Sequence, residues 1–170
     1  MPTGKETENQ VLYNELVTYI QAHQESFYRL AYSYAKNREM ALDMVQNAIY
    51  NALRSIHTLK DSSYIKTWFY RILINASIDE LRKNKRMIST DPSELPEEPV
   101  KQSLGRDELL DLYAALDQLD EKSKTMISLR FFEDMKLEEV ATILGENLST
   151  VKTKLYRTLE KLKIQLEGEV

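Results

Sequence analysis

The residues most suited to chemistry in this 170-residue chain are a cluster of cations near its C-terminus. Between Ser149 and Gln165, five basic residues stand against a single acid, although the whole chain has a formal net charge of −4. Lysine and arginine bind phosphate oxygens and the edges of bases, so a basic helix in an acidic chain is typical of a nucleic-acid contact. A solvated charged helix in a bundle is the alternative. The five cations are Lys152, Lys154, Arg157, Lys161 and Lys163.

The preceding residues predict that this basic segment is the second helix of a helix-turn-helix. Gly145 suits a left-handed helix end, and Ser149 or Thr150 is a candidate cap for the next helix. Five apolar residues have the spacing of two packed helices: Val140, Ala141, Leu144, Val151 and Leu155. We expect the opposite face to contact bases and phosphates through Lys152, Thr153, Tyr156 and Arg157, with Lys154 alongside.

A second basic segment, residues 60–86, holds seven basic residues against three acids. A helix is expected from Tyr64 to about Lys85, with Ser62 or Ser63 as its N-cap. Arg71, Asn75, Ile78 and Arg82 recur at helical spacing and define a mostly polar face. Trp68 has two interpretations, a core residue or an aromatic surface that stacks on a base.

The remaining pattern predicts an all-α protein with two small helical domains. Apolar stripes indicate helices over residues 11–23, 27–34, 40–56, 109–119, 124–132 and 137–144. The third of these has a polar opposite face that includes Asp43, Gln46, Asn47 and Asn51. Residues 87–104 carry three of the four prolines and many acids, without an apolar period. We therefore expect domains at 1–86 and 106–170, joined by a flexible linker at 87–105.

Several classes of function receive no support from the sequence. The chain has no cysteine, and its two histidines, His23 and His57, lie far apart in the sequence. It shows no glycine-rich phosphate loop, zinc pattern or nucleophile elbow. We expect a protein that is not an enzyme, with no cofactor, no metal and no small-molecule substrate. No apolar run is long enough for a membrane span and the N-terminus is polar, so a cytoplasmic location is expected.

Three stretches together resemble the extracytoplasmic-function (ECF) sigma factors, the smallest sigma subunits of bacterial RNA polymerase. The first, FYRLAYSYAKNREMALDMVQNAIYNAL, includes a D-x-V-Q signature at Asp43, Val45 and Gln46. The second is IKTWFYRILINASIDELRKNKR, and the third is LRFFEDMKLEEVATILGENLSTVKTKLYRTLEKLK. Their order, with an acidic proline-containing segment between the last two, is more specific than any one of them. KTWFYRIL and LRFFEDMKLEE are similar to the SigV-type, envelope-stress branch.

The resemblance implies a role for each stretch in directing core RNA polymerase to promoter DNA. Asp43, Gln46 and Asn47 would dock on the polymerase clamp, although the family more often has Glu where Asn47 stands. The last helix would read the −35 element. It also implies an anti-sigma factor as partner, often one that holds the sigma factor at the membrane. Binding and melting of the −10 element would fall to Ser62, Ser63, Tyr64, Arg71, Asn75, Arg82 and Lys83.

Two other functions are compatible with the sequence. A stand-alone helix-turn-helix repressor would dimerise and bind its operator tightly without polymerase. A helical adaptor that binds only proteins would show no salt-sensitive dependence on DNA.

Overall fold

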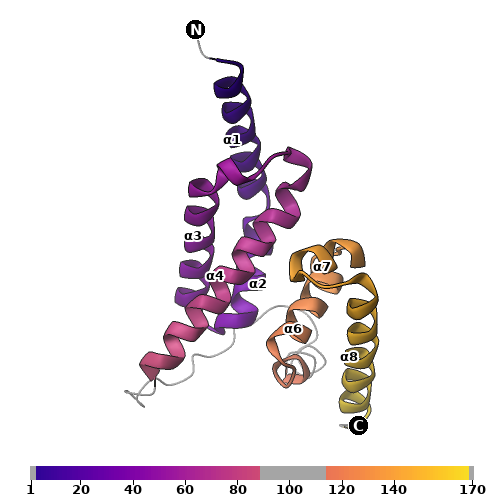
Figure 1. Ribbon diagram of the computed structural model, residues 1–170. Helices are drawn as coiled ribbons and strands as arrows, with labels where there is room; N and C mark the ends of the chain where they lie inside the picture. Colours follow the sequence, from indigo (N-terminus) through magenta and orange to yellow (C-terminus); the bar gives the residue numbers. More distant parts are fainter. Residues whose placement is uncertain (1–2, 89–113, 169–170) are drawn as a thin grey trace. The chain divides into compact units, whose positions relative to one another are not determined.

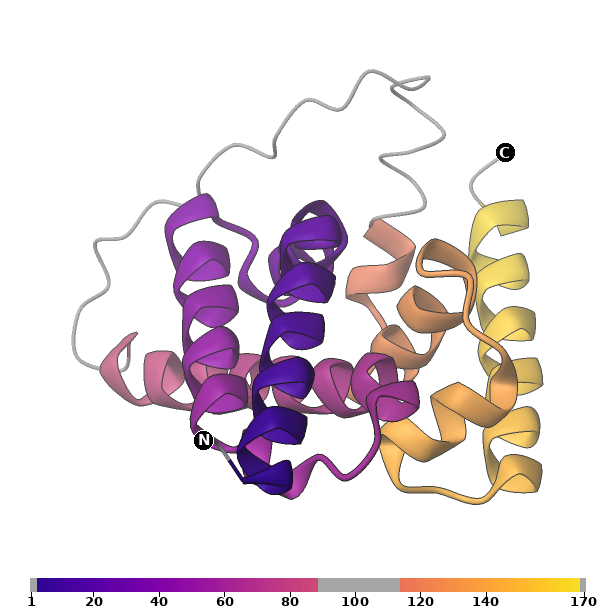
Figure 2. The same ribbon diagram turned by 90° about the horizontal axis from the view of Figure 1, so that it is seen from above.

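The computed structural model describes residues 3–88 and 114–168, and every regular element in these two ranges is helical (Figures 1 and 2). The predicted all-α class is therefore confirmed. Contacts divide the chain into two compact units, Met1–Pro99 and Val100–Val170. Of the predicted linker at 87–105, all but the first two residues lie outside the described ranges. Those two residues continue the last helix of the first unit.

Within residues 3–88, the first unit holds four helices and two short 3₁₀ turns. The helices are α1 (Gly4–Ala22), α2 (Gln24–Ala35), α3 (Arg38–Arg54) and α4 (Ile65–Ile88). The 3₁₀ turns η1 (Ile56–Thr58) and η2 (Ser62–Tyr64) lie between α3 and α4. Helices α2, α3 and α4 pack against one another in all three pairings (Figures 1 and 2).

Aromatic rings join α1, α2 and α4 in the core of this unit. The fully buried rings of Phe27 and Phe69 have centroids 4.5 Å apart, and Tyr70 lies edge-on to Phe27 at 5.4 Å. Tyr19 of α1 lies 5.8 Å from Phe27. Burial of these large aromatic rings contributes strongly to the folding free energy of a small core. The cluster fixes α4, and with it the second basic segment, on the bundle.

Helix α1 begins at Gly4, seven residues before the start expected from the apolar pattern. Its first half projects past the other helices of the unit in Figure 1, and only Leu16 and Ile20 are buried. The early start needs no apolar stripe, because the carboxylate of Glu6 accepts the N–H of Thr3 at 2.9 Å and caps the first turn. Apolar periodicity alone misses a helix that is held by its cap and by helix-forming side chains.

In the described part of the second unit, residues 114–168, two helices pack against a long C-terminal one. After a helical turn at residues 114–117 come α6 (Glu121–Ile127), the π-helical turn η3 (Ser128–Phe132), α7 (Leu137–Leu144) and α8 (Leu148–Gly168). Both α6 and α7 pack on α8 (Figure 1). The buried apolar residues of this unit include Met126, Leu129, Met135, Val140, Val151 and Leu155.

Candidate nucleic-acid interface

A left-handed glycine closes the turn that precedes α8. Gly145 has φ 67° and ψ 32°, as its position in the sequence predicts. Its N–H donates to the carbonyl of Thr142 at 3.3 Å, and the N–H of Glu146 donates to the carbonyl of Ala141 at 3.0 Å. These bonds satisfy carbonyls at the end of α7. The chain therefore turns within three residues, and α8 starts at Leu148.

The predicted cap of α8 at Ser149 or Thr150 is wrong. Helix α8 already begins at Leu148, so both residues lie in its first turn. The carbonyl of Asn147 accepts the N–H of Val151 at 3.0 Å, which closes that turn. Asparagine is as good a residue as serine at this position. The carbonyl of Ser149 instead accepts the hydroxyl of Thr153 at 3.0 Å.

Helix α8 divides its residues sharply between core and surface. Val151, Leu155, Thr158 and Leu162 are buried. The four residues of the predicted reading face, Lys152, Thr153, Tyr156 and Arg157, are all exposed, and Tyr156 is 65% accessible. The side chains of the reading face lie on the solvent-exposed side of α8.

Lys154 differs from the reading face in its surroundings. Its Nζ lies 2.8 Å from Oε1 of Glu146, and Nζ of Lys122 on α6 lies 3.4 Å from the same oxygen. The hydrogen bond from Lys154 holds the pKa of the Glu146 carboxyl below its usual value; burial acts the other way, and Lys122 assists in lowering it. The sequence reveals no such pairing, because the two lysines lie 24 and 8 residues from Glu146.

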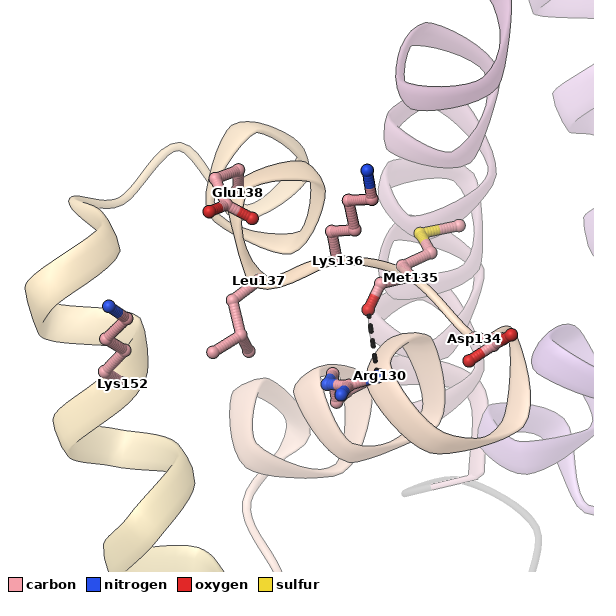
Figure 3. Close-up of a pocket in the computed structure, with 7 residues that line it drawn as sticks. All are labelled: Arg130, Asp134, Met135, Lys136, Leu137, Glu138 and Lys152. Atoms are coloured by element: carbon pink, nitrogen blue, oxygen red, sulfur yellow. Dashed lines mark hydrogen bonds between the residues drawn. The ribbon is translucent and has the colours of Figure 1, made fainter.

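A shallow hollow of about 410 Å³ lies beside the reading face (Figure 3). Arg130 of η3 and Lys152 of α8 line it on either side of Leu137, and the Nη1 of Arg130 donates to the carbonyl of Met135 at 3.4 Å. Lys136 is a third cation in the lining, beside the acids Asp134 and Glu138. The hollow places two further cations, which the sequence reasoning missed, near Lys152. Their basic type is the only signal the sequence offers.

The second basic surface runs along α4 and the 3₁₀ turn before it. Tyr64 is 62% accessible. The other predicted residues are also exposed: Ser62, Ser63, Arg71, Asn75, Arg82 and Lys83. All seven therefore lie on the surface of the first unit.

Asp61, rather than Ser62 or Ser63, caps the start of this segment. Its Oδ1 accepts the N–H of Ser63 at 3.0 Å, and its carbonyl accepts the N–H of Tyr64 at 3.1 Å. The predicted N-cap is thus wrong by one or two residues, because Ser62–Tyr64 forms a 3₁₀ turn that the sequence does not distinguish from the first turn of α4. An aspartate cap suits the positive end of a helical segment.

Trp68 fits neither of its two interpretations fully. Its side chain is half-buried, and the indole N–H donates to the hydroxyl of Thr58 at 3.3 Å. The hydroxyl of Thr58 in turn donates to the carbonyl of Ser55 at 2.7 Å. Trp68 therefore ties α4 to η1.

Helix α3 carries a surface that is more apolar than the sequence suggested. Asp43, Gln46 and Asn47 are exposed as expected. Leu42 and Tyr50, which the prediction omitted, lie on the same helix and are 41% and 62% accessible. Neither residue belongs to the apolar stripe of α3. An apolar residue outside that stripe is the sequence signal that could have predicted an exposed apolar side chain. Exposed apolar side chains beside polar ones are typical of protein interfaces.

Within 3–88 and 114–168, no three or more His, Asp or Glu side chains come together in a way that could hold a metal ion. Nor does any helix in these ranges have the length and apolar character needed to cross a membrane.

Two sigma-70 families match the chain. Sigma-70 region 2 matches residues 19–87, which cover the α3 surface and the second basic surface. Sigma-70, region 4, matches residues 109–162, which cover the turn and the reading face. The predicted site residues all fall inside the two matched ranges.

Among curated proteins, the chain is 50% identical over 154 residues to RNA polymerase sigma factor SigV of Bacillus subtilis, covering 91% of this chain and 92% of that protein. It is 30% identical over 158 residues to the ECF RNA polymerase sigma factor SigX of the same organism, covering 85% and 80%.

Two solved structures share the fold. One is the sigma factor RpoE in complex with the anti-sigma factor NepR from Bartonella quintana, with a TM-score of 0.75, 22% identity and coverage of 88% of this chain and 95% of that one. The other is CnrH in complex with the cytosolic domain of CnrY, with a TM-score of 0.69, 21% identity and coverage of 91% and 89%. Both sigma-70 regions match the chain, and it is 50% identical to SigV and 30% identical to SigX. The chain therefore belongs to the ECF family of RNA polymerase sigma factors.

Proposed function

We propose that this chain binds core RNA polymerase and directs it to initiate transcription at a specific set of promoters. The observation that carries the proposal is the reading face of α8, exposed as a whole on a helix whose opposite side is buried in the core of the second unit. This helix lies largely within the range that matches sigma-70 region 4. A helix that folds through one side can present the other to a major groove without loss of stability.

We assign the two units to the two promoter elements. Domain 106–170 reads the −35 element through Lys152, Thr153, Tyr156 and Arg157. Domain 1–86 binds and melts the −10 element through the second basic surface, whose cations suit the phosphates of a displaced strand. Residues 87–105 link the two. The chain acts by positioning polymerase and performs no catalysis of its own.

The surface of α3 is the proposed docking site for core polymerase. Asp43, Gln46 and Asn47 supply polar contacts, and the exposed Leu42 and Tyr50 add apolar area to them. The guanidinium of Arg54 lies 5.6 Å from the centre of the Tyr50 ring, which holds that ring at the surface. A mixed surface of this kind supports a protein partner better than a solvated face does.

We further propose that an anti-sigma factor regulates the chain, because one structural neighbour, RpoE, is described as bound to the anti-sigma factor NepR. A membrane-anchored anti-sigma factor would hold this otherwise cytoplasmic protein at the membrane. The identity to SigV supports the SigV-type branch. An envelope-stress regulon follows from that resemblance and forms part of the same proposal.

The test is transcription of genomic DNA by core polymerase reconstituted with the purified chain, followed by mapping of the transcript start sites. We expect a limited set of new start sites that share one −35 and one −10 sequence. Failure to initiate at any site would contradict the proposal, as would tight operator binding by a dimer without polymerase.

Variants of the reading face test whether initiation at these sites depends on α8. Lys152→Ala and Arg157→Ala should each weaken initiation at the mapped promoters by about 1–3 kcal/mol for each base that the side chain recognises. Lys5→Ala, an exposed lysine of α1, is the matched control and should initiate normally. Unchanged initiation by both α8 variants would remove the reading face from the site.

A further inference from the structure

Glu146 forms the centre of a three-residue ion cluster between the turn and two helices. Its Oε1 accepts a hydrogen bond from Nζ of Lys154 at 2.8 Å and one from Nζ of Lys122 at 3.4 Å. The Glu146 side chain is only 16% accessible, whereas Lys154 is 42% and Lys122 is 71% accessible. One carboxylate therefore contacts both α6 and α8 from the turn that sets the direction of α8.

The location of this carboxylate explains why it needs cations. Glu146 follows directly after Gly145, the cap at the C-terminal end of α7, where the helix dipole disfavours negative charge. Its low accessibility adds a desolvation cost. The two ammonium groups offset both effects, which agrees with the lowered pKa of the Glu146 carboxyl.

The same geometry limits what Lys154 can do. An ammonium that reached for a DNA phosphate would have to leave a carboxylate 2.8 Å away, and that carboxylate would remain largely buried with only Lys122 as partner. Lys152, two residues earlier, has no such partner among the ion pairs of the described residues and stays exposed on the reading face.

We infer that Lys154 is a positioning residue, held by Glu146 to set the start of α8, and that it neutralises no DNA phosphate. This inference rests on the proposed function. It also gives Glu146 a role: the carboxylate cancels a cation beside the reading face and so limits binding to DNA of any sequence. Removing the carboxylate releases Lys154 for a phosphate.

Counterion release separates a positioning lysine from one that binds phosphate. The logarithm of the DNA-binding constant falls linearly with the logarithm of the salt concentration, and each phosphate contact increases the magnitude of this negative slope by about 0.9 on duplex DNA. Holoenzyme reconstituted with the full chain would be titrated with a promoter fragment carrying one mapped start site, at about 50–200 mM salt. Lys152→Met should reduce the magnitude of the slope by about 0.9. Lys154→Met should leave the slope at the wild-type value and lower affinity equally at every salt concentration.

Three further variants test the ion pair between Glu146 and Lys154. Glu146→Gln should increase the magnitude of the slope by about 0.9, and the double variant Glu146→Gln with Lys154→Met should return to the wild-type slope. Lys154→Arg, which keeps a cation opposite Glu146, should restore the wild-type affinity. A fall in the magnitude of the slope for Lys154→Met equal to that for Lys152→Met would overturn the inference.

Lysine acetylation of the full chain, without DNA or polymerase, tests the ion pair separately. Quantified by mass spectrometry, Lys154 should react more slowly than Lys152 in the wild type and should gain reactivity in Glu146→Gln. Equal reactivity in both proteins would contradict the pairing. If wild-type holoenzyme forms no promoter complex, the proposed function fails first and the role inferred for Lys154 on DNA fails with it, while acetylation still reports on the pair.

Discussion

The indole N–H of Trp68 donates a hydrogen bond to the hydroxyl of Thr58, 3.3 Å away. The same hydroxyl donates to the carbonyl of Ser55 at 2.7 Å, so Thr58 bridges the end of α3 and the first turn of α4. The loop between these helices carries Ser62, Ser63 and Tyr64. The position of those exposed side chains therefore depends on a bond that neither sequence pattern nor apolar periodicity reveals.

Thr58→Val should destabilise the first unit by about 0.5–1 kcal/mol, because the variant lacks the hydroxyl that makes both hydrogen bonds at a partly exposed site. Trp68 is the single tryptophan of the chain, so its fluorescence during urea unfolding reports on this unit alone. Thr58→Ser keeps the hydroxyl and serves as the control with near wild-type stability. Equal midpoints for all three proteins would show that the bridge contributes nothing.

Gly145→Ala should destabilise the second unit by about 1 kcal/mol, because φ 67° is costly for a residue with a Cβ. Hydrogen exchange of the amides of α7 and α8 measures this opening without interference from the first unit. Gly145→Asn is the control, since asparagine tolerates the left-handed region better than alanine does. Slower or unchanged exchange in the alanine variant would contradict the prediction.

The ion cluster at Glu146 should make stability depend on pH on the acid side. Its carboxyl pKa is lowered in the folded protein, so folding is favoured while the group is ionised, and this contribution is complete above the unfolded value, near 4.5. It is lost as the pH falls through the lower folded value. The unfolding free energy of wild type should exceed that of Glu146→Gln by about 0.5–1 kcal/mol at pH 6. The gap should close toward pH 3, and a gap that stays constant would rule out this linkage.

The double variant Asp43→Ala with Gln46→Ala should weaken the association with core polymerase while the helical content, measured by circular dichroism, stays unchanged. Both side chains are exposed on α3, so neither contributes to the core. Tyr50→Ser should weaken association further, because it removes a 62%-accessible ring that supplies apolar area to the interface. Normal co-purification of all these variants with polymerase would place docking elsewhere.

Asn75→Ala should slow the formation of the open complex without reducing the amount of holoenzyme. Asn75 is exposed on α4 at helical spacing from Arg71, so it can reach an unstacked base while the arginine meets a phosphate. Permanganate reactivity of unpaired thymines, followed over time, measures the rate of opening. Asn14→Ala, an exposed asparagine of α1, is the matched control and should open DNA at the wild-type rate.

Sequence patterns predicted the parts of the fold that depend on one-dimensional periodicity. The apolar stripe of α3 and the alternation of core and surface along α8 follow directly from helical spacing, and both are confirmed. The left-handed Gly145 is confirmed for a similar reason, since few residues other than glycine adopt that conformation at low cost.

Features that depend on three-dimensional neighbours were not predictable in the same way. The caps at Asp61 and Asn147 were missed because adjacent polar residues compete for one role and local spacing cannot rank them. Lys154 looked equivalent to Lys152 because both are lysines on one helix, and only the fold places Glu146 next to one of them. The exposed apolar side chains of Leu42 and Tyr50 are not part of the predicted docking surface, because that prediction rests on the polar residues of the helix alone.

The division of α8 into a buried and an exposed side has an evolutionary consequence. Val151, Leu155 and Leu162 hold the helix in place, and none of them belongs to the reading face. Exchanges at Lys152, Thr153, Tyr156 and Arg157 therefore leave the core intact and carry little folding penalty. If the reading face recognises the −35 element as proposed, a gene duplicate of this chain can acquire a new set of promoters by a few surface exchanges. One scaffold can then give rise to many regulators with separate targets.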